Sequence, residues 1–128
     1  MDFKEENFPV YQALVKYESD NIGVKNAIEG FNAAVKGGYK ERFDFAFGIQ
    51  TVVVNMPVGE IKGTDQEGYD KTLRSCFEIF EEAASHGHEL AALMVDDFRA
   101  RGLGQPLPEP APQPVRKAPS PKSQNFDF

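Results

Sequence analysis

One group of side chains suited to chemistry is a candidate metal site. Glu82 precedes His86 by four residues, and His88 follows two residues later. A carboxylate and an imidazole four residues apart share one face of a helix, and both are common zinc ligands. The chain contains only these two histidines, however, and no second cluster of histidine and carboxylate. We therefore favour a polar helix end here and expect neither a bound metal nor another cofactor.

Cys76 is the single cysteine, and it occupies an apolar helical position with no histidine placed to activate a thiolate. A buried free cysteine behaves as a small hydrophobic side chain. The sequence also lacks a glycine-rich phosphate loop and a supported pair of carboxylates, and Gly37 with Gly38 is too weak a signal for phosphate binding. We expect no catalytic residue and a protein that is not an enzyme.

A segment that combines cations with aromatic rings is a better candidate for function. Tyr39 and Phe43 alternate there with basic side chains. Such mixtures bind single-stranded nucleic acid, because the cations contact phosphates and the rings stack on bases. The alternative interpretation is an ordinary solvated surface above buried aromatic rings. The predicted nucleic-acid-binding residues are Lys25, Lys36, Tyr39, Lys40, Arg42 and Phe43, with Lys62, Lys71 and Arg74 as a second basic group.

Residues 105–128 differ from the rest of the chain in composition. Seven of the nine prolines lie within this tail, and each removes an amide donor and fixes φ. The tail is predicted to be a disordered tether with an extended, polyproline-like backbone. Its last residues are predicted to bind a partner protein, with the rings in an apolar pocket and the acidic groups at a basic rim. These residues are Phe126, Asp127 and Phe128.

Length and composition limit the class of protein. The 128 residues suffice for one compact domain, predicted over residues 1–104, followed by the tail at 105–128. No run of about 18 apolar residues is present, so we expect no membrane span. The acidic N-terminal region lacks the pattern of a signal peptide. A single cysteine fits a reducing compartment, and we expect a cytoplasmic location.

The net charge of −6 is distributed unevenly along the chain. The tail carries three basic and two acidic residues, so the residues before it hold a balance of −7. An acidic body is a poor electrostatic match for a nucleic-acid backbone. Any nucleic-acid surface must therefore be a local basic patch. Several copies of the protein would be needed to assemble enough cations, and for this reason we expect a homo-oligomer.

Hydrophobic periodicity predicts helices that would position these groups. The pattern is helical over residues 10–18 and again over 22–35, and the glycines at 37–38 end the second helix. Gly23 and Gly30 lie inside the second helix. They either mark a close approach by a neighbouring backbone or simply weaken the helix.

The stretch from Tyr39 to Met56 supports two interpretations. The alternation of Phe43, Phe45 and Phe47 indicates a strand, and a return through the following loop would make a β-ribbon at about 43–61. The helical context of the chain favours a buried helix instead. The sequence leaves both structures open.

The end of the body predicts a helical hairpin. A capping signal at 64–67 opens an amphipathic helix, Gly87 breaks it, and a second helix runs from about His88 to Gly102. The predicted fold class is therefore mainly α, a small helical domain that ends in a helical hairpin, with the β-ribbon as an alternative within it. The pattern does not fit an OB fold.

The hairpin resembles one unit of a Sel1-like helical repeat. The residues concerned run AASHGHELAALMVDDFRARGLGQP, with small residues where the two helices approach and glycines at the turns. A solenoid needs about three or more such units, and no second copy is present. The resemblance implies a protein-interaction adaptor without nucleic-acid binding, which is our alternative function.

The tail plan resembles that of bacterial-type single-strand-binding proteins, in which a linker leads to an acidic tip that ends in Phe. The matching residues are Asp127 and Phe128, with Phe126 as a second ring, but Asp127 is the sole acid near the tip. Size, tail and the lack of an OB pattern resemble more closely the Drc-type early single-stranded-DNA-binding proteins of lytic phages. That resemblance rests on the overall plan, and no binding residue is transferred from it.

The leading hypothesis from the sequence combines these features. The Drc-type resemblance implies a non-enzymatic, non-OB protein that binds single-stranded DNA in the cytoplasm of a phage host. Its C-terminal tail would recruit replication or transcription proteins to the strand. The basic and aromatic residues named above would contact the DNA.

Overall fold

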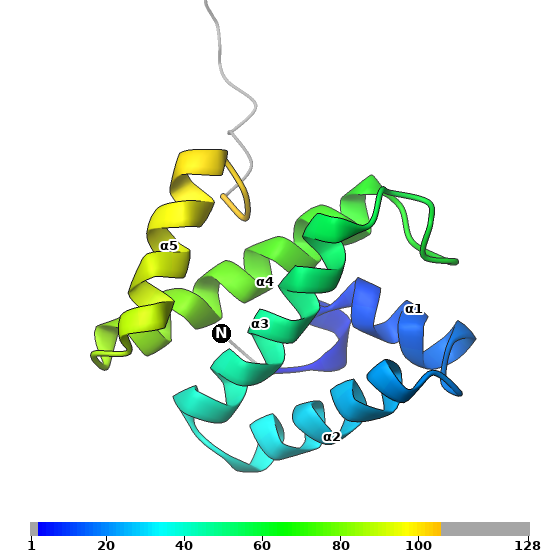
Figure 1. Ribbon diagram of the computed structural model, residues 1–128, viewed down its shortest axis with the longest axis horizontal. Coiled ribbons are helices and arrows are strands. Elements are labelled where there is room, and N and C mark those ends of the chain that lie inside the picture. The colour runs from blue at the N-terminus through cyan, green and yellow to red at the C-terminus, as the bar shows by residue number, and fades with distance from the viewer. Residues whose placement is uncertain (1–2, 106–128) are drawn as a thin grey trace, which may run out of the picture.

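The computed structural model describes residues 3–105, and this part of the chain folds into five α-helices after a short 3₁₀ turn (Figure 1). The prediction of a mainly helical domain is confirmed. Apart from Gln105, the predicted tether, with its tip at 126–128, lies outside the described residues. The elements are η1 (Glu5–Asn7), α1 (Pro9–Tyr17), α2 (Ile22–Lys36), α3 (Tyr39–Asn55), α4 (Gln66–Ser85) and α5 (Glu89–Arg101).

An aromatic cluster joins the N-terminal segment to α1, α2 and α3. Phe45 of α3 lies at its centre, with ring centroids 5.2 Å from Phe8, 5.1 Å from Tyr11 and 5.3 Å from Phe31. Each contact is close to edge-on, an arrangement that is attractive because the positive edge of one ring meets the negative face of another. Phe3 packs against the same cluster. The cluster thus fixes α1 against both neighbouring helices.

Gly37 and Gly38 form the turn between α2 and α3. The Gly38 N–H donates to the Glu41 carboxylate at 2.8 Å, and this bond together with the Glu41 N–H holds the pKa of Glu41 below its usual value. A Cβ at Gly37 would lie 2.6 Å from the Glu41 side chain, so a larger residue would displace it. The two helices diverge from this turn, as Figure 1 shows.

α3 resolves the ambiguity at 39–56, because it is one continuous helix and the β-ribbon at about 43–61 is wrong. The alternating phenylalanines misled because α3 is covered on more than one side. Phe43 packs on Phe80 of α4, Phe45 faces α1 and α2, and Phe47 remains 37% exposed. A helix buried on two sides loses the one-sided period that identifies an amphipathic helix.

The predicted helical hairpin is confirmed as α4 and α5. Asp65 caps α4 by accepting the backbone N–H three residues later at 2.8 Å. Gly87 turns the chain with φ +89°, and His88 caps α5 by accepting a backbone N–H at its Nδ1 at 3.2 Å. Gly102 ends α5 in the left-handed conformation that favours glycine.

The core of the described residues is rich in phenylalanine. Phe8, Phe80 and Phe98 are fully buried and are its largest such side chains. No strand occurs in residues 3–105, so this part of the chain is not an OB barrel. None of the helices described has both the length and the hydropathy that a bilayer crossing requires.

Thr72 of α4 connects α1 to the rest of the fold. Its side chain is fully buried, and its Oγ1 accepts the N–H of Val10 at 3.2 Å while donating to the Gly68 carbonyl at 2.8 Å. Val10 lies in the first turn of α1, where backbone N–H groups have no partner within the helix. Thr72 therefore supplies an acceptor that α1 itself lacks.

Replacing Thr72 by Val should keep the shape of this contact but leave the Val10 N–H without an acceptor. We expect the free energy of unfolding in urea to fall by about 1–3 kcal/mol. Hydrogen exchange at the Val10 amide should accelerate in Thr72→Val and remain slow in Thr72→Ser, which keeps the hydroxyl. An unchanged exchange rate in Thr72→Val would contradict this role.

Candidate functional site

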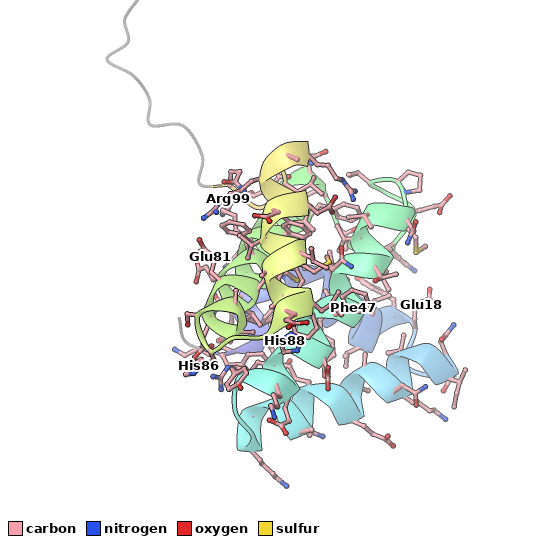
Figure 2. All side chains as sticks on the ribbon, turned by 60° about the vertical axis from the view of Figure 1, so that its left-hand side comes forward. Glu18, Phe47, Glu81, His86, His88 and Arg99 are labelled. Atoms are coloured by element: carbon pink, nitrogen blue, oxygen red, sulfur yellow. The ribbon has the colours of Figure 1, made fainter. Side chains whose placement is uncertain are left out.

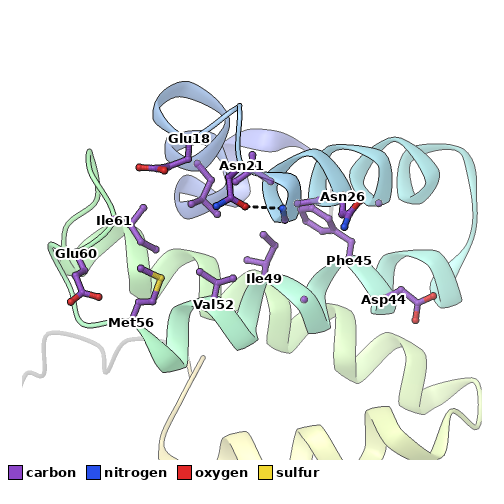
Figure 3. A pocket seen from close by; sticks show the side chains of 16 residues that line it. Glu18, Asn21, Asn26, Asp44, Phe45, Ile49, Val52, Met56, Glu60 and Ile61 are labelled. Carbon is purple, nitrogen blue, oxygen red and sulfur yellow. Dashed lines mark hydrogen bonds between the residues drawn. The ribbon is translucent and has the colours of Figure 1, made fainter.

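A groove of about 510 Å³ lies between α2 and α3 (Figure 3). This volume is within the range of sites that hold a small molecule or several side chains of a peptide. Residues at its base, such as Phe45 and Ile49, are buried, whereas others along its rim, such as Asn26 and Gly48, are exposed. Its base and walls are mostly apolar and include Leu14, Phe45, Ile49, Val52, Met56 and Ile61.

Glycines keep this groove open. Gly23 and Gly30 of α2 and Gly48 of α3 all line it. A Cβ at Gly48 would meet no atom within 4 Å, and one at Gly30 would approach only the Phe45 ring, at 3.9 Å. Gly30 therefore borders open space and does not mark a close approach by a neighbouring backbone, one of the two roles considered for it above.

The loop at residues 56–65 closes one end of the groove. Gly63 has φ +83° and lies against the ring of Tyr17, where a Cβ would come within 2.5 Å of that ring. The hydroxyl of Tyr69 in α4 donates to the Pro57 carbonyl at 3.0 Å. These two contacts hold the loop between α1 and α4. They thereby fix the positions of the loop residues that line the groove.

Carboxylates lie at both ends of the groove, and no Lys or Arg is among the described residues that line it. Glu18 and Glu60 lie at the end closed by the loop, and Asp44 lies towards the α2–α3 turn (Figure 3). The α3 segment from Asp44 to Met56 spans about 18 Å at 1.5 Å per residue. Because opposite charges attract, the groove suits an apolar segment with cations near its two ends.

The structure brings together only part of the predicted nucleic-acid-binding set. Tyr39, Lys40 and Arg42 lie in the first turn of α3, beside the turn between α4 and α5. The Tyr39 ring is stacked on His86, with centroids 4.3 Å apart and planes 6° from parallel. Arg42 forms two hydrogen bonds with the Glu82 carboxylate, from Nη2 at 2.9 Å and from Nε at 3.3 Å. Both side chains are thus engaged within the protein.

The remaining predicted residues divide into one buried ring and three exposed lysines. Phe43 is 3% exposed, so its ring offers no open face to a base. Lys25, Lys36 and Lys40 are exposed, and none forms an ion pair with another residue of the described part. Lys25 and Lys36 share one face of α2 about 16 Å apart, because 11 residues make close to three helical turns.

The residues of the candidate metal site have other partners. Glu82 is bound by Arg42, His86 stacks on Tyr39, and His88 caps α5. Figure 2 shows both histidines near the turn that joins α4 to α5. In residues 3–105, no group of three or more His, Cys, Asp or Glu side chains is placed to hold a metal ion.

Cys76 is a core residue of α4. Its side chain is fully buried, and its Sγ lies 3.5 Å from the Ala46 carbonyl, to which the S–H donates. Burial raises the pKa of the thiol, which therefore stays protonated at neutral pH. A protonated, inaccessible thiol is not a nucleophile.

Comparison of the chain with protein-family models, curated protein sequences and solved structures found no match. The groove was not among the sites predicted from the sequence. The signal for it was present in Gly23 and Gly30, which lie seven residues apart on one face of α2, and in Gly48 on the next helix.

Because a Cβ at Gly48 would project into open space, Gly48→Ala should not disturb packing. We expect the free energy of unfolding in urea to rise by about 0.5–1 kcal/mol, since alanine is the better helix former. As a control, Gly104→Ala should destabilise the protein, because its φ is +66° and its Cβ would lie 2.7 Å from the Leu73 carbonyl oxygen. A loss of stability in Gly48→Ala would show that position 48 is not open.

Proposed function

We propose that this protein is a non-enzymatic adaptor that binds a segment of another protein in the α2–α3 groove. The observation that carries this proposal is the combination of apolar walls with carboxylates at both ends of one groove. Apolar walls favour burial of side chains, and the charges select an orientation and a register. Among the described residues, no Ser, Thr, Cys or His lines the groove, and its carboxylates belong to no group of three or more side chains that could hold a metal ion.

The groove defines the chemistry of the partner segment. Its length of about 18 Å accommodates five or six residues of extended chain or about three turns of helix. The segment should carry small or medium apolar side chains in its middle and Lys or Arg near its ends. Binding of an amphipathic or extended segment in an apolar groove is a common mode of peptide recognition.

Selection of displayed random 12-residue peptides on the full chain tests this proposal. We expect the enriched peptides to combine apolar residues with Lys or Arg. They should bind the Gly48→Leu variant more weakly than the original chain, by about tenfold or more, because leucine fills the groove. Gly48→Ala is the matched control and should retain most of the affinity. Enriched peptides that bind Gly48→Leu as well as the original chain would refute the adaptor function.

A second candidate function is the binding of single-stranded DNA at the end of the molecule that carries Tyr39. The observation in its favour is that Lys36 and Lys40 are exposed, unpaired within the described residues and adjacent to a half-buried aromatic ring. In this proposal the phosphates contact the lysines, and Tyr39 offers its edge or outer face to a base. Several copies of the protein together form a DNA-binding surface, which is distinct from the α2–α3 groove. The tail tip at 126–128 then recruits replication or transcription proteins.

Titration of a fluorescent oligo-dT with micromolar protein at low salt tests the second candidate. Replacing both Lys36 and Lys40 by Glu should weaken binding about tenfold or more, because each lysine releases counterions from a phosphate. The control replaces Lys16 and Lys62 by Glu, which changes the net charge equally at another place. Absence of binding by the original chain, or equal losses in the two variants, would exclude this surface as a DNA site.

A further inference from the structure

A basic segment of this chain has the chemistry that the α2–α3 groove selects. Residues 115–122 read VRKAPSPK, with Arg116 and Lys117 near one end and Lys122 at the other. The residues between these cations carry no charge and include two prolines. Three of the four central residues, Ala118, Pro119 and Pro121, are small and apolar, so the segment has the pattern of cation, mostly apolar centre and cation that the groove requires.

The spacing of the cations agrees with the length of the groove. In a polyproline-type backbone, which rises about 3.1 Å per residue, the six steps from Arg116 to Lys122 cover about 19 Å. The carboxylate ends of the groove are separated by about 18 Å of α3. Proline also restricts the unbound chain, so that less conformational entropy is lost when such a segment binds.

The segment is long enough to reach the groove from the end of the described chain. Gly104 packs against Leu73 of α4, and Tyr69, one turn earlier in that helix, bonds to Pro57 at the closed end of the groove. The direct path from Gly104 to that end is thus about one turn of α4 plus one tyrosine side chain, and because Tyr69 is buried the chain must pass over it. The ten residues that precede 115–122 extend to about 31 Å, which exceeds this path.

We propose that residues 115–122 occupy the α2–α3 groove of their own chain and so compete with partner segments. This inference rests on the adaptor function proposed above. Because the chain arrives at the closed end, Arg116 and Lys117 meet the two carboxylates there, and Lys122 meets Asp44 at the far end. Attachment gives the segment a millimolar effective concentration, so a weak individual affinity is enough to fill the groove.

Paramagnetic relaxation in the full chain locates the segment directly. The Ser120→Cys variant takes a nitroxide label at position 120 only, because Cys76 is fully buried. We expect the amide signals of Gly30, Gly48 and Val52 to lose most of their intensity, while that of Arg99, which pairs with Glu81 on the far side of α4, keeps its own. Replacing Glu18 and Glu60 by Lys should restore the lost signals.

Controls separate this effect from net charge and from contacts between molecules. Replacing Glu78 and Asp96 by Lys changes the charge equally on α4 and α5 and should leave the broadening intact. A mixture of isotope-labelled chains without nitroxide and unlabelled chains with nitroxide should show no broadening at the groove. Broadening in that mixture, or broadening spread evenly over the surface, would overturn an intramolecular contact.

Peptide affinity separates failure of this inference from failure of the adaptor function. With Arg116, Lys117 and Lys122 replaced by Glu, peptides selected for the groove should bind about tenfold more tightly, because the competing segment is removed. Equal affinity for both chains would reject the competition and leave the adaptor function standing. If no peptide binds the groove of either chain, the adaptor function itself fails.

Discussion

The arrangement of the first three helices depends on the ring of Phe45. Its edge-on contacts with Phe8, Tyr11 and Phe31 join the N-terminal segment, α1 and α2 to α3, and the same ring forms part of the groove base. A buried aromatic cluster of this kind contributes several kcal/mol through burial and ring geometry together. The packing of Phe45 in the core therefore helps to set the position of α2 relative to α3, and with it the shape of the groove.

The acidic charge of the body bears differently on the two proposed functions. A phosphate backbone approaching Lys36 and Lys40 also meets the exposed carboxylate of Glu41, which accepts the Gly38 N–H in the turn between α2 and α3. The charge-assisted pair between Arg42 and Glu82 would have to be broken before Arg42 could bind phosphate. A cationic peptide meets less opposition at the groove, because the charged residues that line it are all acidic, although Lys16 and Lys62 lie beside Tyr17 at its closed end. Electrostatics thus favour the peptide over the strand.

The sequence predicted most of the fold because helix periods and caps are local signals. The hairpin followed from the capping residues near Asp65 and the break at Gly87, and both are properties of short segments. α3 remained ambiguous because its burial on several sides depends on helices that are distant in sequence. The pairing of Arg42 with Glu82, 40 residues away, was likewise outside the reach of local patterns. The candidate site was predicted least well for the same reason.

Glycine at position 48 is unfavourable for the stability of α3, and this suggests that the open groove beside it serves a function. Glycine inside a helix costs about 1 kcal/mol relative to alanine, and a side chain at position 48 would meet no neighbour within 4 Å. The fold alone would therefore be more stable with alanine there, and nothing in the backbone geometry of α3 requires glycine at that point. Glycines that line both walls of one groove lower the stability of two helices and leave apolar surface uncovered. A bound segment would cover that surface. The free energy gained by burying it would offset the stability that the glycines cost the two helices.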